Sequence, residues 1–499
     1  MVAPRQPLKG FLADLLADQG QLQTPVARLA AAHGSPGSQL SALSSQLIPL
    51  TTPGPGEQYA FEVDLDACSG CKACVVACHA LNGLEENESW RDVGFVHGGT
   101  PAAPFQQTVT TACHHCADPA CLNGCPVLAY EKDPVTGIVR HLDDQCIGCQ
   151  YCVLKCPYDV PKYSERLGIV RKCDMCHQRL GAGEAPACVQ ACPTAAITIV
   201  KVSVHVSGHP HVDTSAFLPV APDPAYTQPT TRYLSAKPLP ANLVAADAAA
   251  LRPQPAHWPL VIMLTLLPVS VGCYAAAASF IPNRFVTYYI TNLAWLLGAT
   301  GLAASVFHLG QPLRAWRIFL GWRKSWLSRE AMVFGAWFGL ATLTTLTAAG
   351  LVPAILSLRL LLGATVATGL LGLGCSVMIY VDTRRQFWRL AQTAPRFFGT
   401  AALATLALIA PRAAGLLLIA KLAWESRTFF DGSVSARLQR GPLRTGSAIR
   451  DLLGIGALVL LFTLPGWTAF TLLLAGEIAE RCLFFRAVDA PKMPGSVRA

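Results

Sequence analysis

The stretch Cys146-Ile-Gly-Cys149-Gln-Tyr-Cys152-Val-Leu-Lys-Cys156-Pro157 decides what kind of domain this chain can form. Two residues separate each of its first three cysteines, three residues separate the last two, and a proline follows at once. In this pattern three thiolates bind one iron–sulfur cube, and the cysteine before proline points away to bind a different cube. The spacing therefore predicts neighbouring cubes that share one run of ligands.

Three further groups vary the same pattern, so that sixteen cysteines lie between Cys68 and Cys192. The first group lacks the proline, the second has four residues in its middle gap, and the last has eleven. We expect all sixteen to be cofactor-binding iron ligands, as in bacterial ferredoxins. Besides the third group quoted above, the members are Cys68, Cys71, Cys74 and Cys78; Cys113, Cys116, Cys121 and Cys125; and Cys173, Cys176, Cys188 and Cys192.

Two other uses of cysteine fit this pattern less well. Paired C-x-x-C motifs also form tetrahedral zinc sites, but such sites seldom use triplets with a lone cysteine before proline. Tight triplets also cannot all reach remote partners in the geometry that a disulfide needs. Iron–sulfur ligation is therefore the favoured interpretation, with zinc as its alternative.

Composition divides the 499 residues into two unlike halves. Residues 1–257 carry 17 Lys and Arg against 22 Asp and Glu, a net charge of −5, whereas residues 258–499 carry 22 against 8, a net of +14. The positive charge lies between apolar stretches, so it indicates membrane topology rather than nucleic-acid binding. The N-terminus shows neither a secretory signal nor a twin-arginine pair, and we expect the first half to begin in the cytoplasm.

The pattern predicts four segments. Residues 1–57 are an N-terminal arm with weak amphipathic stretches, either a surface arm or a clamp on a partner subunit. Residues 58–202 are an α+β domain of the double bacterial-ferredoxin type, with strands expected at 59–65, 137–142 and 196–202. Residues 203–257 are a linker rich in proline and alanine that is long enough to lie over a partner or over the cluster domain. Residues 258–499 are an all-α membrane anchor domain.

Eight apolar segments in the last part are candidates for membrane spans, although six or seven spans remain open. Four are about 20 residues long, and four shorter ones form two tight hairpins around Pro411-Arg412 and Pro465-Gly466. With eight spans, the loops on the side of the cluster domain hold 17 Lys and Arg, against 3 on the opposite side. The positive-inside rule then places the cluster domain on the cytoplasmic face of the inner (cell) membrane. The segments are 258–280, 287–309, 331–350, 360–381, 397–410, 413–424, 452–464 and 468–485.

A second redox partner is expected in the membrane half. It contains no c-type haem motif, and His308 is its one histidine close to a membrane surface within a predicted span. A quinone needs a proton donor or acceptor at its carbonyl, which suits histidine. We therefore predict a quinone site at His308, with Arg314 and Glu330 on the same side; the alternative is a capping histidine and ordinary interface charges.

Another ionisable set is expected inside the last span. Glu477 lies there with Glu480 and Arg481 about one turn away. Charges within a membrane are functional by default, but an internal ion pair that only joins helices is an equal alternative.

Both halves resemble one known family. The order and spacing of the cysteine groups are similar to those of the four-cluster electron-transfer subunit of the dimethyl sulfoxide reductase family of molybdoenzymes. The stretches His257-Trp258-Pro259-Leu260, Phe307-His308-Leu309-Gly310 with the following Pro312 and Arg314-Ala315, and Leu474-Ala475-Gly476-Glu477 resemble the anchor subunit of that family. These subunits are usually separate polypeptides, so the sequence resembles a fusion over residues 58–490.

The resemblance implies four [4Fe-4S] clusters, because all sixteen positions are cysteine. It also implies that the family's quinol-site histidine falls on His308. The implied ligand sets are Cys68, Cys71, Cys74 with Cys192; Cys173, Cys176, Cys188 with Cys78; Cys113, Cys116, Cys121 with Cys156; and Cys146, Cys149, Cys152 with Cys125.

The resemblance further implies an electron-transfer and membrane-anchor subunit of anaerobic respiration. It would pass electrons between a separate molybdopterin catalytic subunit and the quinone pool, menaquinone or ubiquinone. In the respiratory sulfoxide reductases the cluster subunit faces outward; the reversed loop charge here favours the alternative of a cytoplasm-facing sulfite dehydrogenase that reduces quinone. A cluster-based redox-sensing membrane protein is an alternative of another class, for which we find no output domain, and a cluster-driven ion pump is a further one.

Overall fold

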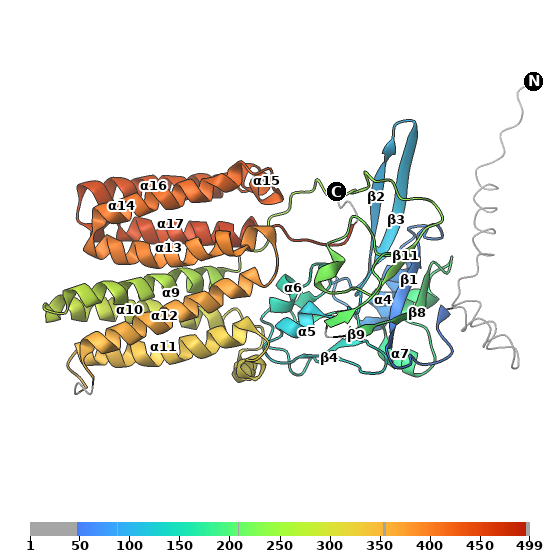
Figure 1. Cartoon of the computed structure of the whole chain (residues 1–499), viewed down its shortest axis with the longest axis horizontal. Helices are drawn as coiled ribbons and strands as arrows, with labels where there is room; N and C mark the ends of the chain where they lie inside the picture. Colours follow the sequence, from blue (N-terminus) through green and yellow to red (C-terminus); the bar gives the residue numbers. More distant parts are fainter. Residues whose placement is uncertain (1–46, 87, 208, 353–355, 496–499) are drawn as a thin grey trace, which may run out of the picture.

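The computed structural model describes residues 47–495 except 87, 208 and 353–355, and it places two domains end to end along the longest axis (Figure 1). Long helices form one end, and short strands and helices form the other. Most of the expected arm, residues 1–57, lies outside the described residues. Leu47 and Ile48 belong to the described part and are buried in the core that surrounds the cysteine loops.

Strand β1 (Glu57–Asp64) organises the cluster domain. It pairs antiparallel with β8 (Ile197–Ser203) along seven residue pairs. Because β1 precedes the first cysteine group and β8 follows the last, this pairing closes the segment that carries all sixteen cysteines. The strands expected from sequence are confirmed as β1, β8 and β5 (Val139–His141).

Between β1 and β8 the chain alternates small hairpins with short helices that begin inside or next to the cysteine groups. β4 pairs antiparallel with β5, and β6 pairs antiparallel with β7. This strand–loop–helix alternation is the expected ferredoxin-like arrangement. The further bounds are β4 (Tyr130–Lys132), β6 (Lys162–Ser164), β7 (Ile169–Arg171), α4 (Ala73–Asn82), α5 (Ala120–Gly124), α6 (Tyr151–Lys155), α7 (His177–Gly181) and α8 (Ala187–Gln190).

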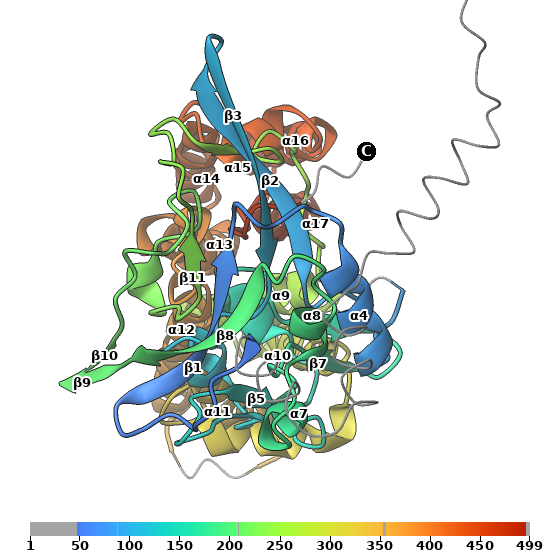
Figure 2. The same cartoon turned by 90° about the vertical axis from the view of Figure 1, so that its right-hand side faces the viewer.

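Residues 203–257, expected as a linker, lie over the cluster domain. Strand β11 extends the β1 sheet in parallel, and β12 pairs with β2, whose hairpin with β3 projects from the domain (Figure 2). Large apolar side chains of this segment, Phe217, Leu218 and Tyr233, are buried against strands β1, β2 and β3 of the cluster domain. The bounds are β2 (Asp92–Thr100), β3 (Ala103–Thr111), β9 (His205–Ser207), β10 (His209–His211), η1 (Pro224–Tyr226), β11 (Arg232–Leu234) and β12 (Val244–Ala245).

The membrane domain contains eight long helices among the described residues, and two of the turns between them are the predicted tight hairpins. Five helices, α9 to α12 and α16, are long and apolar enough to cross a membrane. Of the other three, α14 has only 16 residues, α13 contains Pro395 and Arg396, and α17 contains four charged residues. The bounds are α9 (Trp258–Ala277), α10 (Arg284–Val306), α11 (Trp326–Ala348), α12 (Leu358–Val381), α13 (Leu390–Ile409), α14 (Pro411–Ser426), α15 (Val434–Arg440), α16 (Arg444–Thr463) and α17 (Gly466–Arg486), with the 3-10 turns η2 (Ala278–Phe280), η3 (Pro312–Gly321), η4 (Gln386–Trp388) and η5 (Arg427–Phe429).

After α17 the polypeptide returns to the cluster domain. Met493 is buried in the core formed by β1, β2, β3 and the segment after β10. Lys492 forms an ion pair with Asp247, and the backbone of Pro494 lies so close to Gly94 that a side chain there would not fit. The last helix of the bundle therefore ends on the side of the cluster domain, where α9 begins.

Candidate functional site

Two cavities of the cluster domain are each lined by four cysteines from two different groups. Cys113, Cys116 and Cys121 line one cavity together with Cys156 of the third group. Cys68, Cys71 and Cys74 line the other together with Cys192 of the last group. The cysteine before proline thus reaches away from its own group in both cases.

The remaining eight cysteines are neighbours in the same crossed manner. Cys78 lies close enough to Cys176 and Cys188 for their charges to interact. Cys125 stands in the same relation to Cys146, Cys149 and Cys152. Charges also interact across the implied sets, as between Cys74 and Cys188 and between Cys173 and Cys113, so the ligand sets stay a prediction.

One backbone feature recurs in all four groups. The residue before the second cysteine has a positive φ: 73° at Gly70, 39° at His115, 70° at Gly148 and 58° at Met175. This turn directs backbone N–H groups at sulfur, as between Gly148 N and Cys146 Sγ at 3.4 Å and between Met175 N and Cys173 Sγ at 3.4 Å. Such donors suit ionised thiolates, which are the form that binds iron.

The donor set fits a cube better than a single zinc ion. With Zn–S bonds of about 2.3 Å in a tetrahedron, zinc would draw its four sulfur atoms to within about 3.8 Å of one another. No group of three or more His, Cys, Asp or Glu side chains among the described residues converges in this way on a single ion. Eight of the sulfur atoms line the two cavities instead, in sets of four, as a larger inorganic core requires.

Two buried cations between the cysteine sets were missed by the sequence analysis. Lys172 Nζ lies 3.7 Å from Cys113 Sγ, and Arg91 interacts with the charges of Cys74 and Cys188. Burial alone would lower the pKa of Lys172, but the thiolates around it, Cys113 foremost, outweigh burial and raise that pKa. These cations offset the negative charge of thiolates in a dry interior.

The third cysteine group docks directly on the membrane domain. Gly310, which follows α10, lies against Gly148 and the carbonyl of Gly168 so closely that no side chain would fit. The Gln311 backbone N–H donates to the Ile147 carbonyl at 3.1 Å. Backbone contacts therefore hold the loop of this group directly against the membrane domain.

Helix α6 of the same group is fastened to the end of α12. Lys155 Nζ lies 2.7 Å from Asp382 Oδ2, and the Tyr151 hydroxyl donates to a carbonyl of α12 at 3.0 Å. Arg385 Nε donates in return to the Leu154 carbonyl at 3.2 Å. The cluster domain and the bundle thus meet in one extensive polar contact.

His308 lies beneath the loop of the third cysteine group, two residues before Gly310. It follows the end of α10, outside the helix predicted to contain it, because the helix stops at Val306. Its ring stands edge-on to the ring of His257, with the centroids 5.3 Å apart. Burial first, and then the neighbouring His257, lower the pKa of His308 to about 4, which favours a neutral imidazole at neutral pH.

The structure does not gather the other two predicted quinone-site residues around His308. Arg314 Nη1 donates to the carbonyls of Asp143 and Cys146 at 3.0 and 3.2 Å, so it fastens the cysteine loop. Glu330 lies inside α11 rather than before it, where it is buried and accepts a hydrogen bond from Ser376. No hydrogen bond or ion pair within the described parts of the sequence joins either residue to His308.

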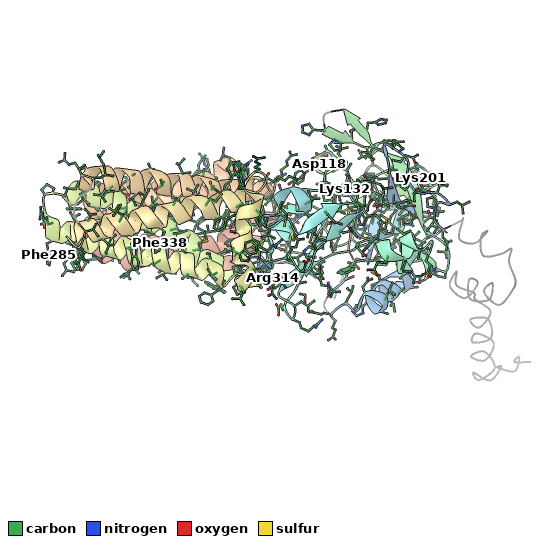
Figure 3. All side chains as sticks on the ribbon, turned by 90° about the horizontal axis from the view of Figure 1, so that it is seen from below. Asp118, Lys132, Lys201, Phe285, Arg314 and Phe338 are labelled. Carbon is green, nitrogen blue, oxygen red and sulfur yellow. The ribbon has the colours of Figure 1, made fainter. Side chains whose placement is uncertain are left out.

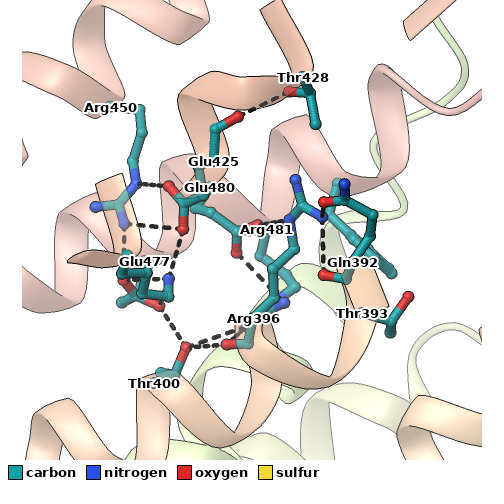
Figure 4. A network of polar contacts seen from close by, with 12 residues as sticks. Gln392, Thr393, Arg396, Thr400, Glu425, Thr428, Arg450, Glu477, Glu480 and Arg481 are labelled. Carbon is teal, nitrogen blue, oxygen red and sulfur yellow. Dashed lines mark hydrogen bonds and ion pairs between the residues drawn. The ribbon is translucent and has the colours of Figure 1, made fainter. Parts of the chain in front are cut away.

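The ionisable set around Glu477 is larger than the sequence indicated (Figure 4). Glu477 binds Lys421 at 2.8 Å and Arg450 at 3.0 Å, two cations from other helices. Each carboxylate of the set has a cationic partner, so the set joins α13, α14, α16 and α17 as an ion-pair network. Its members are Arg396, Lys421, Glu425, Arg450, Glu477, Glu480 and Arg481.

Comparisons with known proteins agree with both halves. Residues 105–202 match the 4Fe-4S dicluster domain, and residues 256–429 match the DMSO reductase anchor subunit (DmsC). The B subunit of the anaerobic dimethyl sulfoxide reductase of Haemophilus influenzae is 37% identical over 155 residues, which are 29% of this polypeptide and 75% of that protein. Its counterpart in Escherichia coli K12 is 38% identical over 148 residues, 28% of this polypeptide and 72% of that protein.

More distant similarity extends to related respiratory subunits. The formate dehydrogenase-O iron-sulfur subunit of Escherichia coli K12 is 34% identical over 158 residues, 28% of this polypeptide and 52% of that protein. The alignment covers more than two thirds of the B subunit of each reductase. In this protein the match to the anchor subunit, residues 256–429, comes after the aligned region. The protein therefore belongs to the dimethyl sulfoxide reductase family, with the iron–sulfur subunit and the DmsC-type membrane anchor fused in one polypeptide.

Proposed function

We propose that this subunit carries electrons between a separate molybdopterin catalytic subunit and the membrane quinone pool. The observation that carries the proposal is the contact at the junction, where Gln311, three residues after His308, donates its backbone N–H to the carbonyl of Ile147 in the loop of Cys149 at 3.1 Å. A cysteine loop and a candidate quinone histidine are thereby held together without an intervening layer. The names of the relatives support a sulfoxide-reductase-like complex as the setting.

The sixteen cysteines would hold four [4Fe-4S] clusters in the crossed sets described above. Such clusters accept and release single electrons at potentials set by their surroundings. The protein supplies thiolates, backbone N–H donors to sulfur, and the buried cations Lys172 and Arg91. The set of Cys125, Cys146, Cys149 and Cys152 is next to the bundle, and we assign to it the exchange with quinone.

His308 and His257 would form the quinone site. A quinone takes up two electrons and two protons to become a quinol, so at least one side chain must exchange protons at its carbonyl oxygen. The edge-on His257 ring packs against His308 and limits where a quinone headgroup could lie. His257 is the one residue of this site that the sequence analysis did not assign to it.

We propose eight membrane spans with the cluster domain on the cytoplasmic side. An even number is supported because α9 begins, and α17 ends, next to the cluster domain. The loops on the side of the cluster domain were counted with 17 Lys and Arg, of which Arg396 and Arg450 lie inside the bundle. The remaining 15 still exceed the 3 Lys and Arg on the opposite side of the membrane. Exposed Phe285 and Trp467 lie at the far helix ends, as interfacial aromatic residues do (Figure 3 labels Phe285).

A cytoplasmic active site favours one variant of this function. If the partner oxidises sulfite, electrons run from the catalytic subunit to quinone, opposite to sulfoxide reduction. The loop charge is the observation that supports this variant. Both variants need the same sites in this protein.

The experiment begins with the full-length protein purified from its native membrane in mild detergent. We expect a molybdopterin protein to co-purify, about sixteen iron atoms per polypeptide, and reduction of the clusters by a quinol analogue. His308→Ala should abolish this reduction while the electron paramagnetic resonance spectrum of dithionite-reduced clusters is kept. His209→Ala, at an exposed position in β10, is the matched control, and quinol oxidation that survives His308→Ala would refute the site.

A further inference from the structure

The turn between α10 and α11 presents one apolar ridge to its surroundings. Because η3 is a 3-10 helix with three residues per turn, side chains three apart stand above one another. Leu313, Trp316, Phe319 and the following Trp322 repeat at this interval and are 94%, 61%, 52% and 50% exposed. We call these four residues the η3 ridge.

The opposite side of η3 is fixed to the cluster domain. Arg314 donates to the carbonyls of the third cysteine loop, and Arg317 Nη2 donates to Gln145 Oε1 at 2.9 Å. The Gly321 N–H donates to the Pro126 carbonyl at 2.8 Å, and a side chain at Gly321 would collide there. The helix cannot rotate to bury its ridge without losing these contacts, so something else must cover the ridge.

The charge of the segment that carries the ridge is of one sign. From Phe307 to Arg329 there are five cations and no carboxylate. Guanidinium groups lie over the indole rings of three tryptophans in this stretch, including Arg317 over Trp316 at 5.5 Å and Arg323 over Trp322 at 5.2 Å. Indole rings favour the boundary between acyl chains and headgroups, where Lys and Arg side chains are attracted to anionic lipids.

The position of the ridge agrees with this chemistry. The helix η3 begins just after α10 ends and finishes just before α11 begins, so it lies at the level where the bundle meets the cluster domain (Figure 3 labels Arg314 at this junction). Phe307, just after the end of α10, is also largely exposed.

We propose that the η3 ridge is buried in the lipid interface of the leaflet nearest the cluster domain, with Arg323 and Lys324 on the phosphates of anionic phospholipids. The amphipathic helix lies in the plane of the membrane, as such helices do. The lipid thus covers the outer side of the loop that holds His308. This inference depends on the docking of the membrane domain on the cluster domain and not on the quinone site.

Photocrosslinking in the native membrane tests the position of the ridge. Leu313 and Trp316 are replaced, one at a time, by p-benzoylphenylalanine in the full-length protein, and the adducts are identified by mass spectrometry. We expect phospholipid adducts at both positions. Ile318, on the same helix but off the ridge, and the exposed Val76 of α4 are the controls and should give none. Adducts to a protein subunit at Leu313 and Trp316, or no lipid adduct, would overturn the proposal.

A second measurement tests the anionic preference. The Trp316 photoprobe is compared in lipid nanodiscs of phosphatidylglycerol and of phosphatidylcholine. The combined Arg323→Gln and Lys324→Gln substitution should lower the phosphatidylglycerol adduct several-fold and leave the phosphatidylcholine adduct unchanged. An equal preference for phosphatidylglycerol with and without the two cations would refute the headgroup contact.

Discussion

The imidazole rings of His257 and His308 meet edge to face with centroids 5.3 Å apart, one at the start of α9 and the other just beyond α10. His257 adopts a left-handed backbone with φ of 50°, and its ring also faces the ring of Phe485 at 5.6 Å. Three separated parts of the anchor therefore meet below the loop of Cys149.

His257→Ala should impair quinone turnover without affecting the clusters. Removing the ring leaves space beside His308 and frees its orientation, so we expect the apparent KM for quinol to rise about tenfold, which corresponds to about 1.4 kcal/mol of binding. Steady-state kinetics measure the effect. His257→Phe keeps the edge-to-face packing and should recover much of the loss; an unchanged KM in His257→Ala would exclude the residue from the site.

Gly310→Ala should weaken the junction between the domains. The new methyl group would collide with the carbonyl of Gly168, and overpacking of this kind costs about 1–3 kcal/mol. We expect slower reoxidation of reduced clusters by quinone and a lower midpoint of thermal unfolding. Gly335→Ala in α11, where nothing lies within 4 Å of the new atom, is the control, and equal behaviour of the two variants would contradict the close docking.

Substitution of single cysteines should reveal the crossed ligand sets. Cys71→Ser and Cys192→Ser, although they belong to different sequence groups, should alter the same electron paramagnetic resonance signal. Cys78→Ser should alter another signal, which it shares with Cys188→Ser. If Cys71→Ser and Cys78→Ser, which belong to one sequence group, changed the same signal, the ligand sets would not be crossed.

Glu477→Gln should destabilise the bundle. The change leaves Lys421 and Arg450 in a buried site with one carboxylate fewer, and loss of one partner in a buried ion pair costs about 3–5 kcal/mol. Unfolding in mixed detergent micelles measures the free energy. Adding Lys421→Met to Glu477→Gln should recover part of it, and Asp451→Asn on the exposed side of α16 is the control.

The cysteine spacing was enough to predict the ferredoxin-like domain, because ligand geometry constrains the backbone locally. The strands β1 and β8 followed from local alternation, and the tight helical hairpins from proline and glycine between short apolar runs. The family resemblance set the expectation for the four ligand sets, which stay a prediction until the clusters are examined.

Other features depend on contacts between distant segments and left no local pattern. Packing of the helical bundle brings His257 next to His308. It also brings Lys421 and Arg450 into ion pairs with Glu477. Residues 203–257 lack periodicity, yet Phe217 and Tyr233 bury themselves against the cluster domain. Arg314 was assigned to the quinone site from its place in the sequence, whereas its side chain turns to the cysteine loop.

The return of the polypeptide after α17 limits how this protein can be divided. A chimera that joins residues 47–257 to a foreign anchor would lack Met493 and would expose an apolar slot between β1 and β3. Cutting at the apparent boundary therefore removes part of the core of the first domain. Modular engineering should keep residues 487–495 with the iron–sulfur half, either as a grafted tail or as an added peptide.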